Sequence, residues 1–283
     1  MGLTKDLASW RFIKSFLLKT FACVGAISTI LQFIALFFPK SLAVQGSGGL
    51  SLAIGISLII GVITSWPRPI EQQYSSPNTK IRIIKGDILD ATGHLVIGTC
   101  DTFDTKTPTI IARSSLQGQV LEKLYGGDLE HLDRQLHESL ADKLPVGEIK
   151  KDGKKLKFGI GAIATIKQSA RNIFFVAYTE MNEHNQAYST ADNVWKSLTE
   201  LWSTISRKGN GYPVYIPVIG GGQARLSSVL PAQDSIRFTI LSFMFASRKE
   251  KICDELVIVV HPNDYKRLDR LELQSFLSSL KPS

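Results

Sequence analysis

The chain has 283 residues, of which 44% are hydrophobic and 20% charged, and its formal net charge is +8. This length accommodates one ordinary domain plus an extra segment. The charge is uneven, because residues 1–70 hold six basic residues and one acidic residue. That bias is typical of a basic segment beside a membrane, so the net charge gives little reason to expect a nucleic-acid partner.

The cysteines and histidines indicate neither a structural disulfide nor a metal site. Cys23, Cys100 and Cys253 form no Cys-x-x-Cys pair. A sparse, odd set of cysteines indicates a reducing compartment without structural disulfides. No group of His, Cys or Asp has the spacing of metal ligands, so we predict no metal and no cofactor. His131 and His137 fall in a charged run expected to be helical, which we interpret as a solvated face.

Two uncharged runs near the N-terminus predict a membrane anchor over residues 1–70. The first, at 20–38, is long enough to cross a hydrocarbon core of about 30 Å as a helix. The second falls within 41–66, and turn-forming residues separate the two. Two spans of this kind make a helical hairpin. A signal peptide and a buried soluble hairpin are the alternatives, although a signal peptide has a shorter apolar region.

The basic residues around these runs predict the orientation of the hairpin. Four of them, Lys5, Arg11, Lys14 and Lys19, precede the first run, and Arg68 follows the second. Only Lys40 falls in the connecting loop. The positive-inside rule therefore puts both ends in the cytoplasm, with the rest of the chain as a cytoplasmic domain.

Small residues recur four apart in both runs and predict close helix packing. The pairs are Ala22 with Ala26, Ser51 with Gly55, and Ser57 with Gly61. Small residues at this spacing let helices approach closely in lipid. The packing they serve is either between chains of a homo-oligomer or within one hairpin.

After a proline-containing linker expected at 71–80, the pattern changes to that of an α/β domain over 81–283. Apolar segments typical of strands alternate with amphipathic helical patterns. The expected strands are 81–84, 95–98, 173–178, 214–218 and 256–260, with a weaker one at 161–166. The expected helices are 117–123, 129–143, 191–206, 231–247 and 265–280. This alternation predicts a central sheet with helices on its faces.

The strongest candidate binding signal is a glycine segment directly after an expected strand. Its residues are Pro217, Val218, Ile219, Gly220, Gly221, Gly222, Gln223, Ala224 and Arg225. Glycines let backbone amides approach phosphate oxygens, and a following helix N-terminus adds partial positive charge. The segment is neither a Walker A loop nor G-x-G-x-x-G. A plain turn is the alternative, and Arg225 is either an anion contact or a surface charge.

A second signal, Gly86-Asp87-Ile88, follows the first strand of this domain. The Asp87 carboxylate is placed to accept a hydrogen bond from an exocyclic amine, although aspartate in a turn is common.

Together the two signals resemble the macrodomain family and its macrodomain-like mixed sheet. The resemblance implies that Asp87 contacts adenine N6, that Ile88 adds a backbone contact, and that residues 220–223 wrap the phosphates of ADP-ribose. The intervening stretch 161–165 also looks like a macrodomain strand.

The chain departs from hydrolytic macrodomains after its second strand. Such relatives carry Asn-Ala-Ala-Asn and a glycine triplet there, whereas this chain reads Gly98-Thr99-Cys100-Asp101 with no triplet following. We therefore expect no catalytic residue and no enzyme activity. Asp101 is the candidate contact for a ribose hydroxyl. Arg113, Gln117 and Gln119 are candidates for phosphate or a distal group of the ligand, and a surface polar residue is the alternative interpretation of each. Cys100 is interpreted as a small buried residue rather than a nucleophile.

An N-terminal hairpin followed by a divergent macrodomain resembles the membrane effectors of type II Thoeris antiphage systems. The resemblance implies a partner TIR-domain enzyme that makes an ADP-ribose-derived nucleotide, and a macrodomain that senses it. It also implies membrane helices that then disrupt the membrane lipids of the bacterial inner membrane. A membrane-tethered hydrolase of ADP-ribose, and a scaffold for ADP-ribosylated proteins, are the alternative functions.

Overall fold

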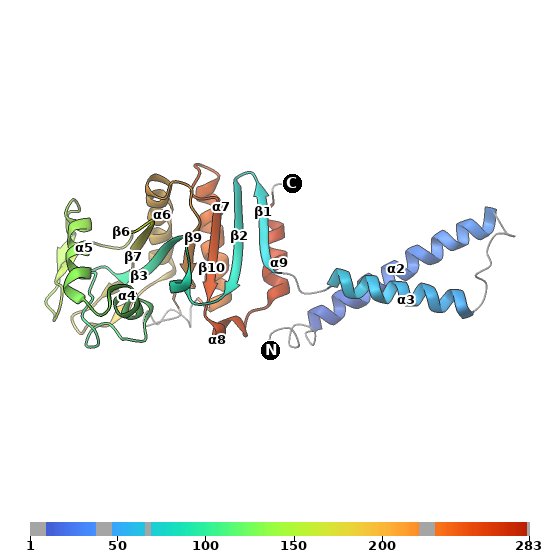
Figure 1. Cartoon of the computed structure of the whole chain (residues 1–283), viewed down its shortest axis with the longest axis horizontal. Helices are drawn as coiled ribbons and strands as arrows, with labels where there is room; N and C mark the ends of the chain where they lie inside the picture. The colour runs from blue at the N-terminus through green and yellow to red at the C-terminus, as the bar shows by residue number, and fades with distance from the viewer. Residues whose placement is uncertain (1–9, 38–46, 66–68, 221–229, 282–283) are drawn as a thin grey trace. The chain divides into compact units, whose positions relative to one another are not determined.

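The computed structural model describes every residue except 1–9, 38–46, 66–68, 221–229 and 282–283. The chain divides into two compact units, Met1–Arg68 and Pro69–Ser283. Figure 1 shows the elements of each unit.

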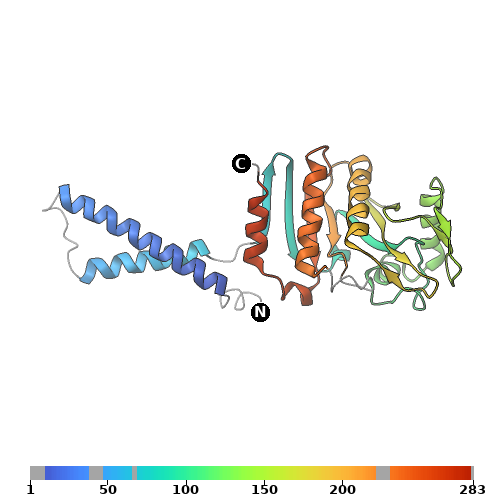
Figure 2. The same cartoon turned by 180° about the vertical axis from the view of Figure 1, so that it is seen from behind.

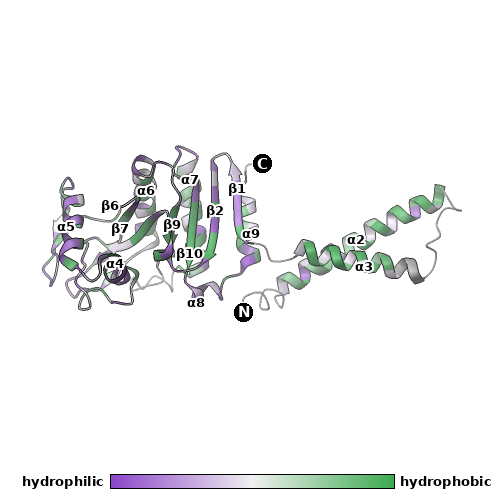
Figure 3. Cartoon of the chain, in the orientation of Figure 1, coloured by the Kyte–Doolittle hydropathy of each residue, from purple (hydrophilic) through white to green (hydrophobic). Residues whose placement is uncertain are grey.

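The first unit contains two apolar helices, α2 (Trp10–Phe37) and α3 (Ser47–Ser65), which pack against each other. Hydrophobic colour covers most of both helices in Figure 3. The Lys19 ammonium donates to the Thr64 carbonyl across the pair, at 2.7 Å. A Cβ added to Gly61 would overlap the Thr20 hydroxyl, so this glycine lets the two helices approach. The small residue at 61 therefore serves packing within one chain.

The two helices differ in their capacity to cross a membrane. Among the described residues, only the stretch Phe12–Ile34 is long and apolar enough. The second predicted span is a shorter apolar helix, Ser51–Ser65, so a two-span hairpin is not established. Large side chains of α2 are exposed, for example Phe21 at 71% and Phe33 at 60%. Such exposure differs from the buried core helix of a soluble protein.

The second unit is built on a mixed sheet whose strands run in the order β1-β2-β10-β9-β3-β7-β6, with β8 paired to β7. The inner strands β2, β10, β9, β3 and β7 are parallel neighbours, whereas β1, β6 and β8 pair antiparallel. The strand bounds are β1 Ile70–Ser75, β2 Asn78–Lys85, β3 His94–Cys100, β6 Ile163–Gln168, β7 Arg171–Met181, β8 Ala187–Tyr188, β9 Val214–Pro217 and β10 Glu255–Val260. A separate hairpin pairs β4 (Gly147–Glu148) with β5 (Leu156–Lys157).

Helices cover both faces of the sheet. In Figure 2 the helices α6, α7 and α9 lie across one face, and in Figure 1 α4 lies on the other. Their bounds are α4 Leu116–Tyr125, α5 Leu129–Leu140, α6 Ala191–Lys208, α7 Ala232–Ser247 and α9 Arg270–Ser279. Short turns of helix, η1 (Ile88–Asp90) and α8 (Pro262–Tyr265), follow β2 and β10.

Side chains alternate between the two faces of the inner strands, and this alternation explains why two hydrophobic cores form. On β10, Leu256 and Ile258 pack into the core beneath α6, α7 and α9, whereas Val257 and Val259 enter the core beneath α4 and α5. Successive strand side chains point to opposite faces, so a strand covered on both sides is apolar throughout. This is why the strands were recognisable as continuous apolar runs.

The predicted fold class, a macrodomain-like mixed sheet with flanking helices, is confirmed. Two local differences concern the ends of the domain. Residues 71–80, expected as a linker, contain most of β1 and the start of β2. Ile70 and Tyr74 are buried on one face of β1, whose other residues are polar. The helix expected at 265–280 is interrupted, since Asp269 caps a new helix, α9, through the Glu272 amide.

Candidate functional site

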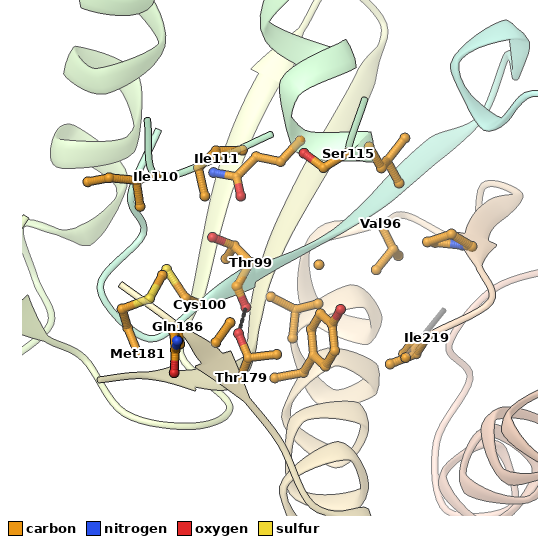
Figure 4. A pocket seen from close by; sticks show the side chains of 18 of the residues that line it. Val96, Thr99, Cys100, Ile110, Ile111, Ser115, Thr179, Met181, Gln186 and Ile219 are labelled. Atoms are coloured by element: carbon orange, nitrogen blue, oxygen red, sulfur yellow. Dashed lines mark hydrogen bonds between the residues drawn. The ribbon is translucent and has the colours of Figure 1, made fainter. Parts of the chain in front are cut away.

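A cavity of about 410 Å³ opens where β3, β7 and β9 end. In open α/β sheets, ligands bind outside the carboxyl ends of the parallel strands, which is where this cavity lies. Figure 4 shows Ile110, Ile111 and Ser115 along one side and Ile219 on another. The lining residues are Val96, Gly98, Thr99, Cys100, Ile110, Ile111, Ser115, Leu116, Gln117, Val176, Tyr178, Thr179, Met181, Asn185, Gln186, Ala187, Pro217, Val218, Ile219 and Gly220.

The floor of the cavity depends on a close approach between neighbouring strands. A Cβ added to Gly98 on β3 would overlap the ring of Tyr178 on β7. Glycine at this position therefore lets the ring lie against the strand beside the cavity. Burial raises the pKa of Tyr178 to about 12, so the phenol stays neutral and presents a hydroxyl rather than an anion.

The predicted glycine segment forms part of the cavity wall as far as the structure describes it. Pro217, Ile219 and Gly220 all line the cavity. Gly220 has φ of 90°, a conformation that favours glycine. The Ile219 carbonyl accepts from the buried Ser235 hydroxyl of α7 at 2.6 Å, which anchors the segment to that helix. The remaining predicted contacts lie outside the described residues; they are Gly221, Gly222, Gln223, Ala224 and Arg225.

Asp87 lies beyond the lining residues, at the end of β2. Its Oδ1 accepts from the Leu89 amide at 3.0 Å and caps η1, and its Oδ2 accepts from the Lys123 ammonium at 2.6 Å. The Lys123 hydrogen bond, followed by the Leu89 amide, lowers the pKa of Asp87. The carboxylate is thus ionised and 35% exposed, whereas Ile88 beside it is buried in the core.

The carboxylate of Asp101 is buried and engaged by protein groups. Its Oδ1 accepts from the Met181 amide at 3.0 Å, and its Oδ2 pairs with the Lys157 ammonium at 3.1 Å. Desolvation raises the pKa of Asp101, against the opposing effect of these two partners. Asp101 is not among the lining residues, so its contact with a ribose hydroxyl stays a prediction.

Of the three further candidates for ligand contact, one lines the cavity and two do not. Gln117 is buried in the wall of the cavity and donates to the Asp104 carbonyl at 2.5 Å. Gln119 instead donates to the Ser114 carbonyl at an exposed position, and neither it nor Arg113 lines the cavity.

Cys100 lines the cavity as a thiol. Burial raises its pKa, and its Sγ lies 3.3 Å from the Thr102 hydroxyl. Because the thiolate is the nucleophilic form, a raised pKa disfavours a nucleophile here. Over the part of the chain that the structure describes, no group of three His, Cys, Asp or Glu residues is placed to hold a metal ion.

Sequence reasoning missed most of the apolar wall. Ile110 and Ile111 come from an unpatterned segment, and Tyr178, Thr179 and Met181 come from the end of β7. The strand at 173–178 was recognised, so the rule that ligands bind at carboxyl ends would have indicated its last residues. Nothing in the periodicity indicates the two isoleucines.

Two comparisons with known proteins point to the same family. Residues 81–261 match the family model described as Thoeris protein ThsA, Macro domain. A relative from Bacillus amyloliquefaciens (strain Y2), named Thoeris protein ThsA, is 23% identical over 237 residues, which cover 80% of this chain and 78% of that protein.

Solved macrodomain structures are similar at lower identity. A macrodomain from Oceanobacillus iheyensis with ADP is 12% identical, covers 75% of this chain and 98% of its own, and gives a TM-score of 0.49. A Trypanosoma brucei macrodomain in complex with ADP-ribose is 10% identical, covers 71% of this chain and 72% of its own, and gives a TM-score of 0.46.

Proposed function

This chain belongs to the macro-domain family of Thoeris protein ThsA, and we propose that it is an antiphage-defence effector whose macrodomain binds an ADP-ribose-derived nucleotide. The observation that carries the proposal is the cavity at the carboxyl ends of β3, β7 and β9, with Gly220 and its neighbours in one wall. The relative named Thoeris protein ThsA supports the assignment to Thoeris defence.

We infer the orientation of the ligand from the strand order. Asp87 follows β2, the glycine segment follows β9, and the cavity extends to β3 and β7, so these features succeed one another along one edge of the sheet. We propose that adenine lies by Asp87, that the diphosphate lies over the glycine segment, and that the distal ribose and its substituent enter the cavity. Backbone amides at a glycine turn and the charge-assisted contact at Asp87 are the matching chemistry.

The chain acts as a sensor in this proposal, not as a hydrolase. The thiol of Cys100 is neutral because burial raises its pKa. The carboxylate of Asp101, the acidic residue nearest in sequence, is held by Lys157 and the Met181 amide. Neither group is arranged to activate water or attack a glycosidic carbon.

The first unit supplies the response in this proposal. Helix α2 contains the stretch Phe12–Ile34, which suffices to cross a membrane, and we propose α3 as a second, shorter span with both ends in the cytoplasm. A TIR-domain partner makes the nucleotide, and binding shifts an equilibrium between assemblies of several chains, so that the helices disrupt the lipid of the inner membrane.

Dye entry into living cells tests the whole proposal. Cells expressing the chain together with a TIR-domain source of the nucleotide should admit a membrane-impermeant dye upon infection. Gly220→Val should abolish the response, because a β-branched residue resists positive φ and intrudes on the phosphate position. Gly147→Val on β4 is the control, since nothing lies within 4 Å of a Cβ added there. Dye entry with the Gly220 variant intact in the membrane would reject the sensor.

A further inference from the structure

A fully buried ion pair stands behind the cavity wall. The Lys151 ammonium lies 2.5 Å from Asp104 Oδ2, and the two side chains are 0% and 1% exposed. Lys151 belongs to the tip of the β4–β5 hairpin, and Asp104 belongs to the segment that joins β3 to α4. The pair therefore joins two segments 47 residues apart, neither of which is part of the central sheet.

Both members of the pair are hydrogen-bonded beyond their mutual contact. Asp104 Oδ2 also accepts from the Thr102 hydroxyl at 2.6 Å, and Oδ1 accepts from the Lys154 amide at 2.8 Å. Lys151 donates in addition to the Asp152 carbonyl at 3.0 Å. A buried charge pair is tolerated only when its remaining donors and acceptors are satisfied, and this one meets that condition.

The same network reaches three lining residues of the cavity. Gln117 donates to the Asp104 carbonyl, and Cys100 contacts the Thr102 hydroxyl that Asp104 holds. A Cβ added to Gly153, at the hairpin tip, would overlap both the Asp104 carboxylate and the Ile110 side chain. The hairpin tip is thus packed directly against the back of the wall whose front faces the cavity in Figure 4.

We propose that Lys151 is a positioning residue for the ligand cavity: through Asp104 it holds residues 100–117 in the shape that receives the ligand. Between β3 and α4, residues 101–115 form no strand or helix. Phe103 packs into the core beneath α4 and α5, whereas Ile110 and Ile111, which face the cavity, belong to a small apolar cluster with Cys100, Met181 and Ala187. A wall fixed before the ligand arrives lowers the ordering cost of binding. The effect on affinity rests on the proposed function, whereas the effect on the wall does not.

The two buried cysteines of this unit report on the wall without any ligand. Cys100 lines the cavity at 4% exposure, whereas Cys253, at 1%, lies before β10 at the opposite edge of the sheet. Local opening of the wall exposes Cys100 alone, and global unfolding exposes both. Their modification rates by N-ethylmaleimide, followed by peptide mass spectrometry on the full-length chain in detergent, separate the two processes.

Lys151→Met should raise the modification rate of Cys100 about ten-fold or more and leave that of Cys253 near its native value, because the stranded Asp104 carboxylate must reach water. Lys155→Met is the matched control, since Lys155 is an exposed lysine of the same hairpin tip, and it should change neither rate. Equal acceleration at both cysteines, or none at Cys100, would overturn the proposal.

A double variant covers the case in which Lys151→Met fails to fold. Asp104→Leu with Lys151→Met leaves no unpaired charge, yet it loses the bonds to Thr102 and to the Lys154 amide. Cys100 should still react faster than in the native chain, and a native rate would show that the pair does not hold the wall.

Titration with ADP-ribose completes the test. The affinity for ADP-ribose should fall about ten-fold in the Lys151→Met variant and stay native in the Lys155→Met control. Native affinity in a Lys151 variant whose Cys100 has become reactive would overturn the positioning role. Absence of binding by the native chain would count against the proposed function instead, while the cysteine rates would still decide whether the wall is held.

Discussion

Two of the aspartate–lysine pairs in the site region have opposite surroundings. Asp87 and Lys123 meet at 2.6 Å with side chains 35% and 50% exposed, whereas Asp104 and Lys151 meet at 2.5 Å with almost no exposure. The first pair is screened by water and free to rearrange, so its worth to stability is small. The second is shielded, so each partner depends on the other. Similar distances therefore accompany different roles: the outer pair is accessible to a ligand, and the inner pair shapes the wall.

The largest expected effect comes from breaking the inner pair from its acidic side. Asp104→Ala leaves the Lys151 ammonium buried without its partner, which typically costs about 3 to 5 kcal/mol. Urea titration of the full-length chain follows the unfolding of its second unit. The free energy of unfolding should be lower than that of the native chain by about that amount. A loss below about 1 kcal/mol would mean that the inner pair behaves like an exposed one, and the contrast between the pairs would be lost.

The outer pair should give the reverse pattern, with a larger effect on binding than on stability. Asp87→Ala removes one charge-assisted hydrogen bond to the ligand, worth about 1.5 to 3 kcal/mol, so the affinity for ADP-ribose should drop roughly ten- to a hundred-fold. Calorimetric titration measures this, with Asp90→Ala as the neighbouring control outside the proposed contacts. Unchanged affinity in a folded Asp87 variant would remove Asp87 from the site.

The smallest expected effect is on the pH dependence of the melting temperature. The Lys123 hydrogen bond lowers the pKa of Asp87, so this group contributes stability above its ordinary pKa of 3.8, and the contribution disappears as pH falls through the depressed value. The melting temperature of the native chain should therefore decline more steeply below pH 4 than that of Asp87→Asn. Since the carboxylate is 35% exposed, the difference should be slight, and a large one would contradict the description of this pair as solvent-screened.

The elements predictable from sequence are those whose own residues determine them. The apolar strands β3, β7 and β10 alternate between two covered faces, so their composition alone indicates burial. Strand β1 was missed because a polar edge strand with two buried side chains resembles a linker. The helix break before Asp269 depends on one capping contact, which a hydrophobic pattern does not record.

The site was predictable where a short motif carries the geometry. Gly220 was identified because glycine at a strand end has a physical reason to be there, and it lines the cavity. Ile110 and Ile111 carry no such reason in sequence, and their placement depends on the contact between Asp104 and Lys151. That contact joins residues from two unpatterned segments, and only the folded chain brings them together.

Amide hydrogen exchange of the full-length chain, with and without ADP-ribose, tests whether this ligand binds at the edge of the sheet where β2, β9 and β3 end. Saturating ADP-ribose should slow exchange in peptides that contain residues 87–89, 98–101 and 217–220, and should leave the opposite edge, around Cys253, unchanged. Absence of any protection, or protection confined to that opposite edge, would contradict the account.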